Sequence, residues 1–166
     1  MPLYTAGQRI RGSEINALPQ TYRVTTDQSN NTVSLINCAG LAFTGEVNAA
    51  YLVECFLFYS AKMATDIAVQ WTCPSGASGF WGASGTESGS GSGAVGQVNR
   101  QGLPIPTGLH AFNGDDGVAA VYADPVASIF LTNAGTVQLQ FRQLTVNTPN
   151  PTIIRAGSAI RVSRLG

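Results

Sequence analysis

Apolar and polar residues alternate along most of the chain after residue 20. Residues 137–142 read Val-Gln-Leu-Gln-Phe-Arg, which places the apolar side chains on one face of a strand and the polar ones on the other. Residues 67–73 show the same alternation and end at Pro74. Further strands are predicted at 22–24, 33–35, 118–122, 126–131 and 159–162. About eight to ten strands with no long helix between them predict antiparallel pairing, and therefore a β-sandwich or barrel.

The segment from Ala50 to Tyr59 departs from that alternation. Both of its faces are apolar except at Glu54. A strand in a monomeric sandwich normally turns one face to water, so a strand that is apolar on both faces needs a second apolar surface. We expect the second face of this strand to pack on a neighbouring subunit or beneath a loop.

Residues 12–19 carry the one helix signal of the chain. Ser13 is a candidate N-cap and Pro19 ends the pattern, which predicts a helix of two turns at most. Residues 1–20 are therefore expected to form an arm that either docks on another protein or frays, followed by a β-domain at 21–166.

Two further segments are predicted to be a turn and a loop. Residues 132–135, Thr-Asn-Ala-Gly, predict a hairpin turn between two strands. The stretch from about 82 to 117 has no clear strand register, and its Gly/Ser-rich part at 84–93 is typical of a flexible, solvated loop.

The charge balance argues against two broad classes of partner. The 166 residues include nine Lys and Arg and nine Asp and Glu, so the net charge is zero, and 11% of residues are charged against about 25% in an average globular protein. Without a basic surface, we expect binding neither to nucleic acid nor to a membrane. The chain has no secretory pattern and no apolar stretch long enough to cross a bilayer, and we expect a soluble protein made in a cytosol.

Candidate chemistry is sparse. Residues 91–96 match G-x-G-x-x-G, but a Gly/Ser loop precedes them where a dinucleotide site needs a strand. His110, the one histidine, has a loop-like context and is expected at the surface. Residues 113–117, Asn-Gly-Asp-Asp-Gly, are interpreted as a turn rather than a calcium loop. We therefore predict no catalytic residue, no cofactor and no metal site.

Three other groups of side chains are candidates for the core or for function. The cysteines lack C-x-x-C spacing and are expected to pack as small apolar residues: Cys38, Cys55 and Cys73. Four aromatic residues are candidates either for the core or for partner contact and sugar stacking: Trp71, Phe80, Trp81 and Tyr122. Four carboxylates, among which no pair stands out, are candidates for glycoside hydrolysis: Glu54, Asp66, Glu87 and Asp124.

Several segments resemble one family of proteins. Residues 4–19 read Tyr-Thr-Ala-Gly-Gln-Arg-Ile-Arg-Gly-Ser-Glu-Ile-Asn-Ala-Leu-Pro. Together with the segments 50–55, 71–76 and 155–162, they resemble small virion proteins of tailed bacteriophages, chiefly those that infect actinobacteria. Such proteins are head-fibre, capsid decoration or minor tail proteins. The resemblance implies a jelly roll similar to the trimeric tumour necrosis factor-like domains, attached to the virion by its N-terminal arm and without catalytic residues.

Residues and resemblance together predict an all-β protein, an antiparallel β-sandwich of the jelly-roll type with a short N-terminal helical arm. We expect a non-enzymatic, trimeric capsid decoration or head-fibre protein on the capsid surface, assembled in the host cytoplasm. Its partners would be two further copies and the major capsid protein or another virion protein. The residues expected to attach it to the virion are Tyr4, Arg9, Ile10, Arg11, Ile15 and Leu18. Those expected at the trimer interface are Tyr51, Val53, Phe56, Phe58 and Arg161.

The alternative is a minor tail or baseplate module that binds a saccharide of the host surface. In that case Trp81 and its neighbours are expected to line an exposed groove.

Overall fold

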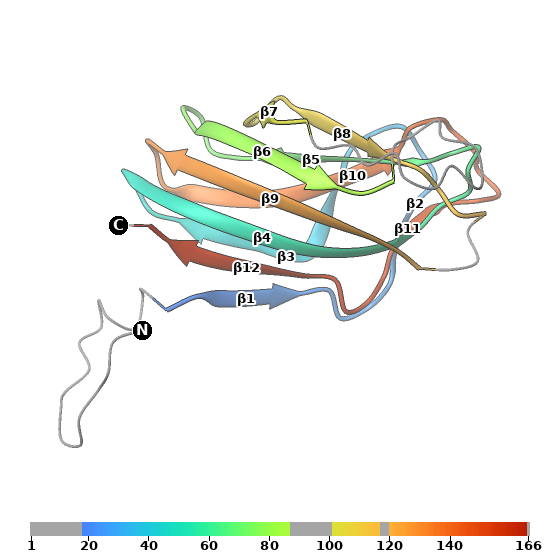
Figure 1. Ribbon diagram of the computed structural model, residues 1–166, viewed down its shortest axis with the longest axis horizontal. Helices are drawn as coiled ribbons and strands as arrows, with labels where there is room; N and C mark the ends of the chain where they lie inside the picture. The colour runs from blue at the N-terminus through green and yellow to red at the C-terminus, as the bar shows by residue number, and fades with distance from the viewer. Residues whose placement is uncertain (1–17, 87–100, 117–119, 166) are drawn as a thin grey trace, which may run out of the picture.

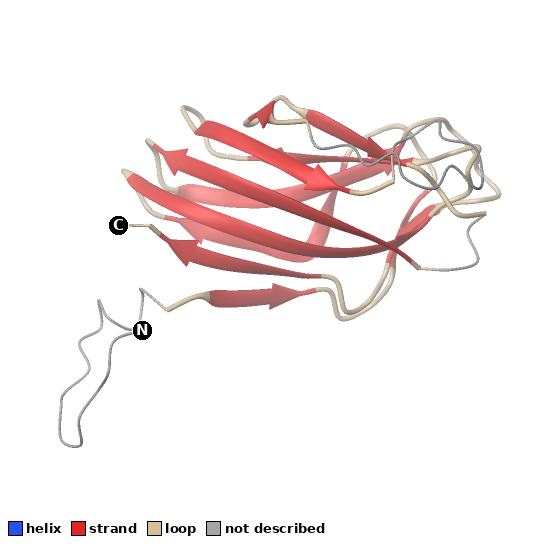
Figure 2. Ribbon diagram, viewed as in Figure 1, coloured by secondary structure: helices blue, strands red, loops and turns tan. Residues whose placement is uncertain are grey.

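The computed structural model describes residues 18–86, 101–116 and 120–165, and the regular elements in this part of the chain are all β-strands (Figures 1 and 2). The predicted all-β class with antiparallel sheets is confirmed. No helix in the described ranges has the length and apolar character to cross a membrane. Of the helix predicted at 12–19, residues 12–17 lie outside the described residues, and Leu18 and Pro19 are not helical.

The strands form two sheets. The larger sheet contains, in order, β1 (Gln20–Arg23), β12 (Ala159–Arg164), β4 (Ala49–Ser60), β9 (Val121–Leu131), β6 (Ser78–Ser84) and β7 (Leu103–Pro104). Two short strands extend it beside the end of β4: β11 (Thr152–Ile154) and β2 (Gln28–Asn30). The smaller sheet contains, in order, β3 (Ile36–Gly45), β10 (Gly135–Gln143), β5 (Ile67–Thr72) and β8 (Leu109–Phe112). Figure 1 shows the sheets as two layers, with β3, β10 and β5 behind β12, β4, β9 and β6.

Strands that follow one another in the chain often lie in different sheets. β3 in the smaller sheet leads into β4 in the larger one, and β9 leads back into β10. The turn predicted at 132–135 is present, but β9 and β10 belong to different sheets, so the prediction of a hairpin there is wrong. A tight turn joins neighbouring strands of one sheet and facing strands of two sheets equally well, so the local sequence does not separate these cases.

The inner faces of both sheets form the core. On β10, Val137, Leu139 and Phe141 are fully buried, as the alternation predicts. On β4, every second residue from Tyr51 to Tyr59 points inward and is buried. Trp71 of β5 is also fully buried. Each such large side chain contributes about 1.5–3 kcal/mol through removal from water.

The free cysteines take part in this core. Cys38 and Cys55 are buried and Cys73 packs against the core from a partly buried position, in agreement with the prediction. Burial raises the pKa of the Cys38 and Cys73 thiols to about 12 and raises that of Cys55 as well. All three thiols therefore stay protonated and unreactive near neutral pH.

The stretch predicted as a loop from 82 to 117 contains more structure than expected. β6 extends into it as far as Ser84, and residues 101–116 contain β7 and β8. β8 pairs with β5, with His110 opposite Val69. His110 is 1% exposed, so the expectation of a surface loop residue is wrong. Leu109, Ala111 and Phe112 beside it fit a strand, and a neutral histidine is tolerated inside because its N–H has a hydrogen-bond acceptor.

His110 packs among aromatic rings. Its ring stacks on Phe112 with centroids 5.9 Å apart and meets Trp81 edge-on at 4.7 Å. Its Nε2 lies 2.8 Å from the carbonyl oxygen of Gln101. Because a carbonyl only accepts, Nε2 carries the proton in this contact. Burial lowers the pKa of His110 below its usual 6.5, and the hydrogen bond to Gln101 opposes that shift in part.

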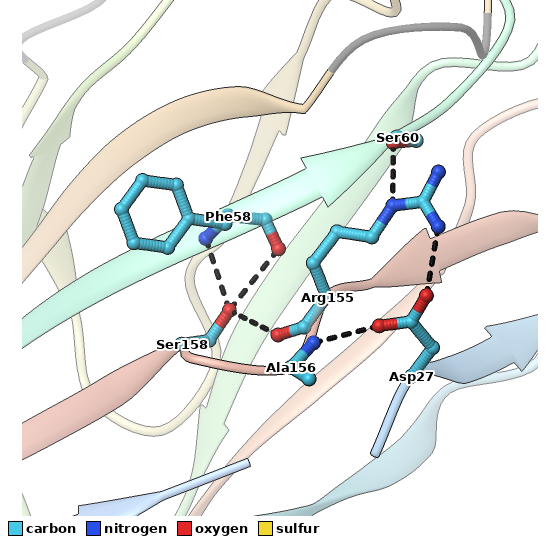
Figure 3. A network of polar contacts seen from close by, with 6 residues as sticks. All are labelled: Asp27, Phe58, Ser60, Arg155, Ala156 and Ser158. Atoms are coloured by element: carbon cyan, nitrogen blue, oxygen red, sulfur yellow. Dashed lines mark hydrogen bonds and ion pairs between the residues drawn. The ribbon is translucent and has the colours of Figure 1, made fainter. Parts of the chain in front are cut away.

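A polar network fastens the end of β4 to the turn between β11 and β12 (Figure 3). Ser158 is fully buried, and its hydroxyl accepts the N–H of Phe58 at 3.0 Å. The same hydroxyl lies 3.1 Å from the carbonyl oxygen of Phe58 and 2.9 Å from that of Arg155. The backbone of β4 is thus held where its pairing passes from β12 to β11.

Arg155 connects this network to Asp27, in the loop after β1. It donates to the Ser60 hydroxyl at 2.8 Å and pairs with Asp27 at 2.7 Å. The other carboxylate oxygen of Asp27 accepts the N–H of Ala156 at 2.8 Å. These contacts hold the pKa of Asp27 below its usual 3.8, and the hydrogen bond from Ala156 contributes most to the shift.

The substitution Ser158→Ala tests this network. It leaves the Phe58 N–H without its acceptor, and we expect a loss of about 1–2 kcal/mol in the free energy of unfolding, measured by urea denaturation. Ser29→Ala, at an exposed position of β2, serves as the control and is expected to change stability by less than about 0.5 kcal/mol. Equal effects of the two substitutions would contradict this role of Ser158.

His110→Phe tests the buried histidine. The unfolded chain takes up a proton at His110 as the pH falls through 6.5, whereas the folded chain, with its lowered pKa, resists protonation. Stability is therefore lost as the pH falls through 6.5 and levels off below the pKa of the folded state. Between about pH 7.5 and about pH 5, we expect the urea midpoint to fall more for the native chain than for His110→Phe. The same fall in both proteins would contradict this assignment.

Candidate functional site

The outer face of the larger sheet carries exposed apolar side chains. On β4, Phe56 and Phe58 point outward because the residues between them point into the core, and they are 48% and 38% exposed. Outward positions of β9 and β6 add side chains that are 41% to 68% exposed. We call the whole set the aromatic face: Phe56, Phe58, Phe80, Tyr122, Val126 and Phe130.

Strand pairing brings these side chains together. Phe58 lies opposite Tyr122, with ring centroids 5.5 Å apart. Phe80 lies opposite Ser128, between Val126 and Phe130 along β9. At about 150–250 Å² per aromatic side chain, the exposed fractions correspond to on the order of 500 Å² of apolar surface. The largest apolar patch on a typical monomer is roughly 300–600 Å² and is often functional, so this face is a candidate contact surface.

Charged groups of both signs interrupt the aromatic face. Arg161 of β12 lies 3.9 Å from Glu54 of β4, and both side chains are partly exposed. Asp124 of β9 accepts the N–H of Ser84 at 2.7 Å. Beside Asp124 the surface is hollowed, and the hollow of about 280 Å³ is lined by Gly82, Ala83, Ser84, Asp124 and Val126.

The outer face of the smaller sheet is polar instead. Outward positions of β10 and β5 carry Gln138, Gln140 and Gln70, each partly buried. The Gln140 amide donates to Asn37 at 2.8 Å and the Gln70 amide donates to Pro106 at 2.7 Å. These amides are satisfied within the chain and suit a surface that faces water, so the two outer faces differ in character.

The residues expected at the trimer interface divide between two places. Phe56, Phe58 and Arg161 lie on the outer face of the larger sheet. Tyr51 and Val53 point to the inner face and are 6% and 0% exposed, because alternate residues of β4 face opposite sides. The side chains of Tyr51 and Val53 therefore belong to the core, and only the other three are placed to contact a second protein.

The residues expected to attach the protein to a virion lie almost entirely outside the described residues: Tyr4, Arg9, Ile10, Arg11 and Ile15. Leu18 is described, and its side chain is 47% exposed. It borders a cavity of about 120 Å³ at one end of the sandwich, which Phe43, Tyr51 and Val162 also line. The Glu46–Arg164 ion pair, at 2.7 Å, lies beside the same cavity.

The aromatic candidates for sugar stacking separate by burial. Trp71 and Trp81 are 0% and 2% exposed, so the expectation that Trp81 lines an exposed groove is wrong. Trp81 is buried because Phe80, its neighbour, takes the outward position of β6. Phe80 and Tyr122 are 68% and 44% exposed and remain available to a partner.

The candidates for acid–base chemistry are scattered. Glu54 and Asp124 lie on the outer face of the larger sheet, Asp66 is buried and accepts the N–H of Gly114, and Glu87 lies outside the described residues. Within residues 18–86, 101–116 and 120–165, no three His, Cys, Asp or Glu side chains group closely enough to hold a metal ion.

Two members of the aromatic face, Val126 and Phe130, were not found by sequence reasoning. Their strand was predicted at 126–131, but its second apolar face was not recognised. The signal is present, because three of the five outward positions of β9 are apolar, namely Tyr122, Val126 and Phe130. β9 is therefore a second strand with two largely apolar faces, and it lies directly beside β4.

Neither any protein-family model nor any curated protein matches the chain. Among solved structures, the tripod from the baseplate of bacteriophage Tuc2009 is similar over 98% of this chain and 73% of that chain, with 11% identity and a TM-score of 0.38. The VP2 subviral particle of infectious bursal disease virus is similar over 89% of this chain and 41% of that chain, with 7% identity and a TM-score of 0.26. A structure of the Gx strain of the same virus is similar over 88% of this chain and 40% of that chain, with 10% identity and a TM-score of 0.24. TM-scores this low do not establish a shared fold.

Proposed function

We propose that the chain is a non-enzymatic structural protein of a bacteriophage virion, a homotrimeric capsid decoration or head-fibre protein attached through its N-terminal arm. The observation that carries the proposal is the aromatic face, because it leaves a large apolar surface open on a sheet whose inner face is already covered. The resemblance of residues 4–19 and 155–162 to phage virion proteins gives that surface a setting, a permanent assembly on a particle.

Self-association is the simplest way to cover the aromatic face. A stable interface buries about 800 Å² on each partner, and its centre is enriched in aromatic side chains and arginine. The aromatic face would supply on the order of 500 Å² of apolar surface to the centre of such an interface. Arg161 and Glu54 lie at the edge of the aromatic face toward β12. With zero net charge, copies of the chain do not repel one another.

The strand order supports the jelly-roll part of the proposal. When β6, β7 and the β2–β11 pair are set aside, eight strands remain in two sheets, β1-β12-β4-β9 and β3-β10-β5-β8. In chain order these strands alternate between the sheets except at β5 and β8, which pair with each other in the smaller sheet, and this is the arrangement of a jelly roll. β6 and β7 then extend the larger sheet beyond β9 and widen the aromatic face by Phe80.

Attachment through the arm is consistent with where the described chain begins and ends. Gln20, at the start of β1, pairs with Val162 near the end of β12, so both ends of the described domain lie at one end of the sandwich. In the proposal the arm leaves the domain from this end and contacts the particle there. In this arrangement the opposite end and the polar outer face of the smaller sheet are left toward solvent.

A second candidate function, a tail or baseplate module that binds a host saccharide, is favoured by one observation. Phe80 is the most exposed aromatic residue of the aromatic face, at 68%, and an exposed ring suits stacking on a sugar. Binding on a glycan array that is lost in Phe80→Ala and kept in Val146→Ala would favour this function over the proposed one.

Truncation of residues 1–17 tests the proposed function. The cut stops before β1, which starts at Gln20, so the β-domain is expected to keep its fold and its trimeric state. Quantitative mass spectrometry of purified particles is expected to find the full chain in multiples of three copies per particle. The number of copies of the truncated chain per particle is expected to be at least about tenfold lower, because the arm provides the contact with the particle. Retention of the truncated chain on particles would contradict attachment through the arm, and absence of the full chain would contradict a virion role.

A further inference from the structure

Two opposite charges on the outer face of the larger sheet lack a close ion-pair partner. Arg161 approaches Glu54 only to 3.9 Å, and its side chain is 54% exposed. The other two ion pairs within the described ranges, Arg155–Asp27 and Arg164–Glu46, are both formed at 2.7 Å. Arg161 is therefore loosely held compared with the other paired arginines.

Asp124 is the matching group of opposite sign. One of its oxygens accepts the N–H of Ser84 at 2.7 Å, which fixes the orientation of the carboxylate. In the described part of the chain no Arg or Lys forms an ion pair with Asp124. The carboxylate lines the hollow together with Gly82, Ser84 and Val126. This shallow surface hollow of about 280 Å³ has room for a guanidinium group beside the carboxylate.

Strand pairing sets Arg161 and the hollow at the same height along the sheet. Arg161 lies opposite Glu54, Glu54 opposite Val126, and Val126 opposite Gly82, which makes one row across β12, β4, β9 and β6. Asp124 is two residues from Val126 on the same face, a distance of roughly 7 Å along β9 that an arginine side chain spans.

We propose that in the homotrimer the Arg161 guanidinium of one copy enters the hollow of the next copy and pairs with Asp124. The inference rests on the proposed trimer and names the residues that fix its register. Rotation about an axis parallel to the strands leaves the height of each residue unchanged. Three copies around such an axis bring the β12 side of one to the β9–β6 side of the next, with Arg161 level with the hollow.

The group that enters the hollow belongs to a second copy, because the same sheet face carries both the cation, Arg161, and the anion, Asp124. A head-to-tail ring needs two complementary patches on each chain, and the cation at β12 and the anion at β9 form such a pair on either side of Phe56. Charge complementarity of this kind selects register and suppresses wrong pairings within an otherwise apolar contact.

Charge reversal tests this pair. Sedimentation equilibrium is measured for the full chain, for Arg161→Glu, for Asp124→Arg and for the chain with both substitutions. Each single reversal places like charges together and is expected to raise the concentration at which the trimer dissociates by about tenfold or more. Both reversals in one chain restore opposite charges and are expected to return that concentration to within about threefold of the original.

Two controls separate this contact from general effects. Arg142→Glu reverses a charge on the outer face of the smaller sheet and is expected to leave the trimer unchanged. Asp124→Asn keeps an acceptor for the Ser84 N–H, so it weakens the trimer without the loss of stability that a damaged β9 would cause. A stable trimer in both single reversals, or no recovery in the double variant, overturns the pair and leaves the trimer standing. A monomeric full chain overturns the trimer itself.

Discussion

The structure depends on one constraint: β4 and β9 are largely apolar on both faces, and the smaller sheet covers only one face of each. On the inner face, Val53 and Leu57 are fully buried. On the outer face, Phe56, Phe58 and Phe130 remain between 38% and 48% exposed. Removing an aromatic side chain from water stabilises a contact by about 1.5–3 kcal/mol, so covering this face is favourable for any partner of matching shape.

Two other features of the molecule position or widen that uncovered face. The Ser158 and Arg155 network holds the end of β4 beside Phe58, and in Figure 3 the Phe58 ring points away from the polar groups that bind its backbone. β6 and β7 widen the same sheet and add Phe80 and the hollow beside Asp124. Side chains held on paired β-strands lose little freedom on association, which lowers the entropic cost of binding.

Much of the fold was predictable because period-two alternation marks strands directly, as on β10. The doubly apolar β4 also predicted an uncovered face, of which Phe56 and Phe58 are members. The sheet to which each strand belongs was not predictable, because the sequence of the turn at 132–135 does not show whether the two strands it joins pair with each other or lie in different sheets. The outward positions of β9 and the burial of His110 were missed because they depend on which strands are neighbours in space.

The mass of the protein in solution tests the central claim most directly. Sedimentation equilibrium of the full chain is predicted to give three times the 17.3 kDa of one chain, and Phe56→Ser combined with Phe58→Ser is predicted to give the mass of one chain. Val146→Ser, which removes a 59% exposed apolar side chain away from the aromatic face, is predicted to remain a trimer. A full chain that sediments as a monomer, or a double variant that stays a trimer, would contradict the account.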